Sequence, residues 1–418
     1  MEVRPGYKVT EVGVVPNDWE CARLSEFLAF ISYGFTNPMP TVQDGIFMIT
    51  AADINDGRLR LETARKTSES AYRTLLTAKS KPRPNDILLT KDGTLGRLAL
   101  VGIETICINQ SVAVLRPNGK VEPPFLKMLL ESPSCQRRML EDAGGSTIKH
   151  IYITIVDKMP IGLPRDKGEQ RAIAAALSDV DALLGGLDRL IAKKRDLKQA
   201  AMQQLLTGQT RLPGFSGEWE VKRLGDVGEI SSAGVDKKLR RDEVPVRLVN
   251  YLDVYHKDFI YSHDLNHWVT APTHQLRRCA VKTGDVFFTP TSETRKDIGL
   301  SAVAMEDIPD AAYSYHVARL RLHEPWDLRF RTYAFKTRAF LDQAETLCDG
   351  NGTRYVISQG KFRSMTVRVP PVSEQTAIAA VLSDMDAELA ALETRRAKTR
   401  ALKQAMMQEL LTGRIRLV

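Results

Sequence analysis

The 418-residue sequence has few cysteines and no long apolar run. Its five cysteines, Cys21, Cys107, Cys135, Cys279 and Cys348, are odd in number and lie without close pairs. This pattern argues against a disulfide framework and predicts free thiols in a reducing compartment. No apolar stretch is long enough to span a bilayer, and the N-terminal residues lack the features of a secretory signal. We therefore expect a cytoplasmic protein with no membrane partner.

Motifs that would indicate an enzyme are also missing. The sequence has no GxxxxGK[ST] phosphate loop, and NPMP at 37–40 and VPPV at 369–372 only echo the Asn-Pro-Pro motif of amino-methyltransferases. His263 and His267 have the helical spacing of a metal-ligand pair, but Pro272 nearby and the lack of a third ligand argue against a metal site. We expect no catalytic residue, no metal and no bound cofactor in this chain.

The positive charge of the chain is modest and widely spread. The net charge is +8 and the pI is about 9.1, while hydrophobic residues make up 43% and charged residues 26% of an ordinary globular composition. A basic balance permits contact with phosphates, but no basic tail or arm is present. If nucleic acid is the partner, the fold has to bring basic side chains that are distant in the sequence together on one surface.

A long segment of the sequence occurs twice. Residues 169–212 return as residues 374–417, and 28 of the 44 aligned positions are identical without a gap. Such self-similarity at a fixed distance is typical of a protein built from two tandem units. Both copies end with LLTG, in which Gly208 and Gly413 can adopt the left-handed conformation that ends a helix.

Each copy carries apolar residues at alternating spacings of three and four, the seam of an amphipathic helix. A long helix with so narrow an apolar stripe needs a partner helix, and its own copy is the simplest candidate. We therefore predict two long helices packed antiparallel about a pseudo-two-fold axis. The alternative is that each helix packs separately on its own domain. The predicted helix–helix contacts are Ile173, Leu177, Val180, Leu184, Leu187, Ile191 and Leu197 in the first helix, and Ile378, Leu382, Met385, Leu389, Leu392 and Leu402 in the second.

The segments before the two helices share a fainter repeat. Short apolar or alternating runs such as DILLT, SVAVLRP, VRLVNYLDV and DVFFT, bounded by turn residues, predict strands, while residues 125–140 and 326–344 predict helices. The expected fold class is α+β. We place two α+β domains at residues 1–166 and 212–372, and the long helices at residues 167–211 and 373–418.

The doubled helix, the Glu-Gln entry at 169–170 and 374–375, and the stretches DILLTKDGT and GGSTIKH resemble the specificity subunit of type I restriction–modification systems. The resemblance covers essentially the whole chain. It implies two target recognition domains, each reading one half of a bipartite, asymmetric site in double-stranded DNA, with the helices setting the spacing. It also implies two methyltransferase subunits and restriction subunits as partners, and S-adenosylmethionine bound by the methyltransferase. No catalysis is implied for this chain.

Polar loops that recur in both domains are the candidate DNA-contacting residues, because base edges and phosphates are read by such side chains. Each loop alone also fits a plain solvated turn. Two other functions stay open from the residues: a protein–protein adaptor without DNA contact, and a divergent nuclease or methyltransferase. The candidates are Tyr33, Thr36, Asn37, Lys91, Gly93, Thr94, Arg97, Asn109, Gln110, Ser146, Thr147, Lys149 and His150 in the first domain, and Thr291, Thr294, Arg295, Lys296, Tyr313, Tyr315, His316, Thr353, Arg354 and Tyr355 in the second.

Overall fold

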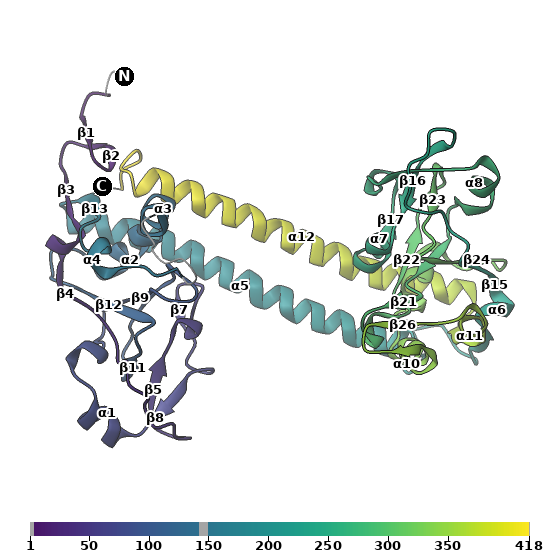
Figure 1. The fold of residues 1–418 in the computed structure, drawn as a ribbon, viewed down its shortest axis with the longest axis horizontal. Helices are drawn as coiled ribbons and strands as arrows, with labels where there is room; N and C mark the ends of the chain where they lie inside the picture. The colour runs from purple at the N-terminus through teal and green to yellow at the C-terminus, as the bar shows by residue number, and fades with distance from the viewer. Residues whose placement is uncertain (1–3, 142–148, 418) are drawn as a thin grey trace. The chain divides into compact units, whose positions relative to one another are not determined.

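A computed structural model describes residues 4–141 and 149–417 of the chain. It divides into two compact units: unit 1 comprises Met1–Asp188 and Thr394–Val418, and unit 2 comprises Arg189–Glu393. Each long helix contributes to both units, since α5 runs from Lys167 to Leu205 and α12 from Val372 to Leu410 (Figure 1). The prediction from sequence instead gave each helix a segment of its own.

Unit 1 contains two main sheets with different strand directions. An antiparallel sheet has the order β10-β9-β12-β4, and a mixed sheet has the order β11-β5-β8, in which β5 and β11 are parallel. Three short strand pairs complete the unit. The strands are β1 (Tyr7–Thr10), β2 (Gly13–Pro16), β3 (Trp19–Arg23), β4 (Leu28–Tyr33), β5 (Ile46–Ile49), β6 (Ile54–Asn55), β7 (Arg58–Leu59), β8 (Arg65–Thr67), β9 (Ile87–Thr90), β10 (Leu98–Leu100), β11 (Ile106–Ile108), β12 (Val112–Pro117) and β13 (Pro160–Pro164).

Unit 2 repeats this topology with added edge strands. Its antiparallel core β22-β20-β24-β15 follows the order β10-β9-β12-β4, and β23-β16-β18 follows β11-β5-β8 with the same parallel and antiparallel pairs. The strands are β14 (Glu220–Arg223), β15 (Gly228–Ser231), β16 (Val244–Val249), β17 (Phe259–Ile260), β18 (Trp268–Ala271), β19 (Ala280–Val281), β20 (Val286–Phe288), β21 (Thr291–Ser292), β22 (Ser301–Ala304), β23 (Ile308–Tyr313), β24 (Ala318–Leu322), β25 (Asp349–Asn351), β26 (Arg354–Val356) and β27 (Thr366–Val369).

Short helices surround these sheets, and one of them replaces a predicted strand. The run VRLVNYLDV is strand only to Val249, because Asn250 and Asp253 form a capping box that starts a helix. The helices of unit 1 are α1 (Glu69–Leu75), α2 (Pro123–Glu131), α3 (Pro133–Glu141) and α4 (Ile153–Val156). Those of unit 2 are α6 (Leu224–Val227), α7 (Tyr251–His256), α8 (Thr273–Cys279), α9 (Leu328–Ala334), α10 (Arg338–Leu347) and α11 (Gln359–Ser364).

The core of each unit joins the first turns of one long helix to the last turns of the other. In unit 1, Ile173 and Leu177 of α5 pack in one apolar cluster with Met407 and Leu410 of α12. In unit 2, the equivalent cluster joins Ile378 and Leu382 of α12 to Met202 and Leu205 of α5. Burying each of these side chains contributes about 1.5–3 kcal/mol. Each α+β domain therefore needs segments of both helices to complete its core.

Within each unit the two helical segments run antiparallel. In unit 1, Lys403 pairs with Asp181 and Arg396 with Asp188; in unit 2, Lys194 pairs with Glu388 and Lys198 with Asp386. In both units, ion-pair residues further along one helix pair with residues nearer the start of the other helix. The predicted antiparallel packing is confirmed within each unit, and packing of each helix on its own domain alone is wrong.

Two residues of the predicted seam are not part of it. Leu197 and Leu402 are 47% and 55% exposed. The seam continues instead through Lys198 and Lys403, which bridge to aspartates of the facing helix, so a leucine one residue earlier is turned about 100° away. The other predicted contacts are buried or half-buried: Ile173, Leu177, Val180, Leu184, Leu187, Ile191, Ile378, Leu382, Met385, Leu389 and Leu392.

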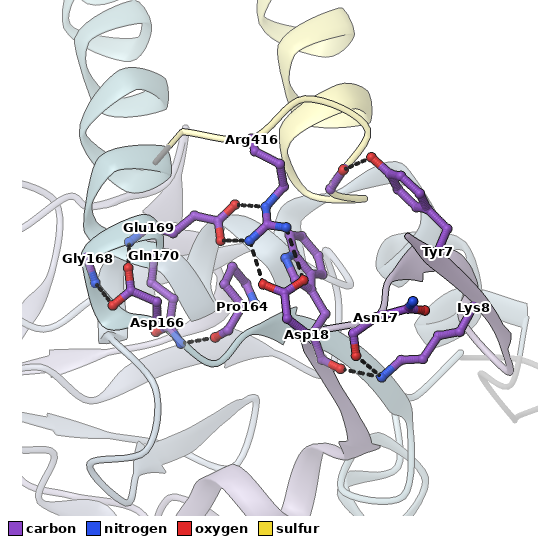
Figure 2. Close-up of polar contacts among 12 residues, drawn as sticks. Tyr7, Lys8, Asn17, Asp18, Pro164, Asp166, Gly168, Glu169, Gln170 and Arg416 are labelled. Carbon is purple, nitrogen blue, oxygen red and sulfur yellow. Dashed lines mark hydrogen bonds and ion pairs between the residues drawn. The ribbon is translucent and has the colours of Figure 1, made fainter. Parts of the chain in front are cut away.

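A buried glutamate at the start of each long helix is held by an arginine that follows the other helix. In unit 1, Arg416 Nε donates to Glu169 Oε1 at 2.5 Å, and its Nη2 donates to Glu169 Oε2 at 2.7 Å and Asp18 Oδ2 at 2.8 Å (Figure 2). In unit 2, Arg211 binds Glu374 at 2.6 and 2.7 Å. We call these two arrangements the arginine clasps. The carboxylates raise the pKa of Arg416, so the guanidinium keeps its charge.

The neighbouring glutamine ties the helix start to the sheet domain. Gln170 Nε2 donates to Pro164 O at 2.7 Å, and Gln170 Oε1 accepts from the backbone N–H of Glu122 at 2.8 Å (Figure 2 shows the first bond). Gln375 repeats both bonds with Pro370 and Asp327. The Glu-Gln pair that marks each copy in the sequence is therefore structural.

The glycines predicted to end the helices do so. Gly208 and Gly413 have φ of 72° and 70°, which a residue with a Cβ adopts only with strain. At Gly413 a Cβ would also lie 2.5 Å from Pro16 Cδ. After this turn the chain reverses and brings Arg416 onto Glu169 (Figure 2).

Replacing the clasp arginine of unit 1 should destabilise the fold. In Arg416→Ala, Glu169 keeps a buried carboxylate without its cation, and we expect the free energy of unfolding to fall by about 3 kcal/mol. The measurement is urea unfolding followed by circular dichroism. The control is Arg414→Ala, which removes an exposed arginine paired with Glu409 at 3.4 Å and should change stability by less than about 0.5 kcal/mol. Equal losses in the two variants would contradict the clasp.

Candidate nucleic-acid interface

One four-residue turn leads into an inner strand of the antiparallel sheet in each unit, β12 in unit 1 and β24 in unit 2. We call Asn109–Val112 and Ser314–Val317 the presenting turns. Each is closed by a backbone bond from its fourth to its first residue, at 3.1 Å in unit 1 and 3.0 Å in unit 2. The first side chain also accepts the backbone N–H of the third residue: Asn109 Oδ1 at 3.1 Å and Ser314 Oγ at 3.3 Å. The same geometry is thus built twice from different residues.

A glycine lets a neighbouring segment lie directly against each presenting turn. A Cβ on Gly34 would lie 1.8 Å from Ile108 O, and one on Gly234 would lie 2.3 Å from Ser314 C. Any side chain at these positions would force the segments apart. The close approach allows backbone bonds from Gln110 N to Phe35 O at 2.8 Å and from Tyr315 N to Val235 O at 3.1 Å. Both turns are therefore fixed to the sheet domain.

A buried threonine at the end of β9 and after β20 fixes the adjacent loop. Thr90 Oγ1 donates to Thr94 O and accepts from the N–H of Arg97. Thr289 Oγ1 donates to Asp297 O at 2.8 Å and accepts from the N–H of Leu300 at 3.1 Å. The loops at residues 90–97 and 289–300 thus have the same base, although their sequences differ in length and charge.

In unit 1, three candidate residues gather beside the presenting turn. Lys91 Nζ lies 2.7 Å from Asp92 Oδ2 and 5.4 Å from the ring centre of Tyr33, and His150 Nδ1 lies 2.5 Å from Asp92 Oδ1. Burial acts to raise the pKa of Asp92, but hydrogen bonds to His150 and Lys91 outweigh it and lower that pKa. Lys79, which the sequence did not single out, also lies over Tyr33 at 5.5 Å. The result is a cationic and aromatic surface suited to a phosphate backbone.

The other candidates of unit 1 divide into exposed and internal side chains. Arg97 is half-buried, and its Nη1 donates to Ile54 O at 3.1 Å, so it supports the loop from inside. Asn109 uses its amide oxygen within the presenting turn. Ser146 and Thr147 lie outside the described residues. The exposed candidates are Thr36, Asn37, Gly93, Thr94, Gln110 and Lys149.

In unit 2, a second surface surrounds the other presenting turn. The ring of Tyr315 lies 3.9 Å from that of His316, and Arg295 lies over the ring of Tyr355 at 5.0 Å. Burial, followed by the charges of Lys237 and Arg354, lowers the pKa of His316. Thr291 is half-buried in β21, and Thr294 Oγ1 donates to Asp297. Lys296, Thr353 and Arg354 are exposed.

Tyr313 was predicted to contact DNA, and this is wrong. Its side chain is fully buried, and its hydroxyl donates to Ser231 Oγ at 2.9 Å. Tyr313 ends β23 on the face that packs into the core, whereas Tyr315 two residues later lies in the turn. Residues two apart lie on the same face only within a strand, and β23 ends at Tyr313. Tyr313 and Tyr315 therefore do not share one surface, although they are two residues apart.

Comparison with known proteins matches both units to one family. The model of the type I restriction–modification DNA specificity domain matches residues 16–192 and 216–400. The chain belongs to this family. The family predicted from the doubled helix and its Glu-Gln entry is thereby confirmed, and nothing in the comparisons supports an adaptor outside it.

Relatives in the specificity family are distant in sequence. The specificity subunit of the type I restriction enzyme EcoBI from Escherichia coli is 26% identical over 239 residues, which cover 55% of this chain and 49% of that protein. The MjaVIII specificity subunit from Methanocaldococcus jannaschii is 23% identical over 423 residues, 96% of this chain and 94% of that one. The chain thus spans about half the length of the first relative and nearly all of the second.

Solved structures of the family share the fold. A chain from a type I restriction–modification complex aligns with a TM-score of 0.61 at 18% identity, covering 96% of this chain and 99% of that one. The specificity subunit from Mycoplasma genitalium aligns with a TM-score of 0.56 at 16% identity, covering 98% of each chain. The α+β class predicted from the sequence is confirmed by this likeness.

Sequence analysis missed the most basic loop of unit 2. Residues 236–241 read DKKLRR, four cations within five positions, and the loop is bonded to β18 by the N–H of Arg240 to Thr270 Oγ1 at 2.7 Å. The loop directly follows Val235, whose backbone carbonyl accepts the N–H of Tyr315 in the presenting turn at 3.1 Å. A search for local charge density, rather than for loops shared by both domains, would have found it.

Two properties of the described part of the chain bear on other functional classes. Residues 4–141 and 149–417 contain no group of three or more His, Cys, Asp or Glu side chains placed to hold a metal ion. No helix in these ranges is both long and apolar enough to cross a membrane.

Removing cations from the loop at residues 236–241 should weaken DNA binding in a salt-dependent way. In Lys237→Ala with Arg241→Ala, two exposed charges are lost, and the slope of log affinity against log salt should fall by about 0.9 for each phosphate contact removed. The measurement is a salt titration of DNA binding by fluorescence anisotropy. Arg329→Ala is the control, because this exposed arginine on α9 lies past the opposite end of β24 from the presenting turn. The same slope change in the control would rule out this surface.

Proposed function

We propose that the chain is the DNA-recognition subunit of a type I restriction–modification complex and that each unit reads one half of a bipartite site in double-stranded DNA. The observation that carries this proposal is the pair of presenting turns. Their backbone bonds are equivalent in the two units, while their exposed side chains are unlike. A turn whose backbone is the same in both units but whose exposed side chains differ is what the recognition of two unlike half-sites requires.

The charges around the turns support DNA as the ligand. Lys79 and Lys91 lie over the ring of Tyr33 in unit 1, and in unit 2 the loop at residues 236–241, which follows Val235 beside the presenting turn, carries four cations. Cations beside a reading side chain neutralise phosphates and set its register on the duplex, while base contacts supply sequence preference.

Catalysis belongs to separate subunits in this proposal. The chain would recognise DNA, two methyltransferase subunits would bind S-adenosylmethionine and methylate the site, and restriction subunits would cleave DNA. The paired helices, whose sequences are identical at 28 of 44 positions, give two similar surfaces for two copies of one partner. The complex would act in the cytoplasm, where its DNA is found.

Methylation mapping tests the whole proposal. In cells that carry the methyltransferase partner, adding this chain should produce methylated adenine in a motif with two unlike halves and an unread gap, detected by sequencing that reports modified bases. The purified chain incubated with labelled S-adenosylmethionine and DNA should transfer no label by itself. Methylation by the isolated chain, or a single continuous motif, would contradict the assigned roles.

A further inference from the structure

The presenting turns expose one side chain each at the same position. In unit 1 the first residue, Asn109, and the third, Ser111, bond to each other, and Ser111 Oγ also accepts from the N–H of Ala51 at 3.0 Å. In unit 2 the first residue, Ser314, is fully buried. Only the second residue, Gln110 or Tyr315, is exposed in both turns.

The backbone under this exposed residue is held from both sides. Gln110 N donates to Phe35 O at 2.8 Å, and the N–H of Asn109 before it donates to Ile49 O at 3.2 Å. In unit 2, Tyr315 N donates to Val235 O at 3.1 Å, and Ser314 N donates to Val249 O at 2.9 Å. Each turn is thus closed by its own backbone bond and bonded to two other segments of the chain. Because the backbone is already fixed, little further backbone entropy is lost when this side chain contacts a base edge.

Several polar groups beside the presenting turns are already engaged with other side chains. Lys91 and His150 both contact Asp92, Thr294 donates to Asp297, and Arg295 lies over the ring of Tyr355. These groups are suited to hold a backbone phosphate or to shape the loop. No side-chain hydrogen bond of Gln110 occurs among the described residues, whereas its backbone N–H is bonded to Phe35 O.

The two exposed side chains have different chemistry for base reading. A glutamine amide carries an NH2 donor group and a carbonyl acceptor in one plane, so the NH2 group can donate to N7 of adenine while the carbonyl accepts from its N6 amino group in the major groove. The Tyr315 ring, held 3.9 Å from the ring of His316, instead offers an apolar face and edge. Apolar contact in the major groove favours thymine, because its 5-methyl group is the apolar feature of that base edge.

We propose that Gln110 and Tyr315 are the specificity-determining residues of their units, Gln110 selecting an adenine through a bidentate amide contact and Tyr315 selecting a thymine through its 5-methyl group. This inference rests on the proposed function and adds to it which residue of each unit chooses a base, and which base. One exchange at a single exposed position of a fixed turn is then enough to change one base of the site.

The test is to map the methylated motif of the complete complex with Gln110→Ala and with Tyr315→Ala. Gln110→Ala should make one adenine position of one half-site degenerate, with discrimination falling roughly 5- to 150-fold, the range for one bidentate base contact. Tyr315→Ala should do the same at one thymine of the other half-site. Both residues are exposed, so the thermal unfolding midpoints should stay at the wild-type value.

Modified bases identify the atoms involved. With 7-deazaadenine at the adenine position, DNA binding by the wild-type complex should weaken, and binding by Gln110→Ala should not weaken further. Deoxyuridine in place of the thymine should act in the same way on the wild type and on Tyr315→Ala. The control is Arg329→Ala, which removes an exposed side chain of α9 outside both presenting turns and should leave both halves of the motif unchanged.

The outcomes separate the inference from the proposed function. If the wild-type complex methylates no defined motif, the proposed function fails. If the wild type has a bipartite motif and either alanine variant keeps it, changes both halves, or relaxes a position that is neither the stated adenine nor the stated thymine, the inference is overturned while the proposed function stands.

Discussion

A buried carboxylate at the start of each long helix fixes the rest of the architecture. Glu169 and Glu374 are almost fully enclosed, and each is neutralised by an arginine from the segment that follows the other helix. A buried charge is tolerated only with such a partner, so each helix start requires the other helix end. The glutamine beside each glutamate then bonds the same point to the sheet domain. Helix, tail and domain are joined at one residue pair.

Beyond the helix starts, the hydrogen bonds and ion pairs that hold the fold are the same in the two units, whereas the exposed side chains differ. The bidentate pair Asp86–Arg116 recurs as Asp285–Arg321, and the threonine that fixes the loop after β9 recurs after β20. At the presenting turns the same backbone bonds carry glutamine in one unit and tyrosine in the other. Two copies of one framework therefore support different surfaces, as expected of a protein that recognises two unlike sequences.

The sequence predicted the features that follow from local pattern. Apolar spacing gave the long helices, Gly208 and Gly413 gave their ends, and the internal repeat gave their antiparallel pairing. It failed where tertiary contacts decide: lysines that bridge to the facing helix displace Leu197 and Leu402 from the seam, and burial of Tyr313 removes it from the surface. Lys79 could not be predicted, since it is distant in sequence from the Tyr33 ring that it approaches.

The arginine clasps also impose an order on synthesis. Unit 2 consists of one continuous segment, Arg189–Glu393, whereas unit 1 consists of two segments, the second of which begins at Thr394. The domain that is made first therefore cannot close its core until the residues from Thr394 onward have left the ribosome, and the domain made second has all of its residues before then. A premature stop shortly after residue 393 would leave unit 2 complete. Unit 1 would lack its part of α12, and the carboxylate of Glu169 would lack its cation, Arg416.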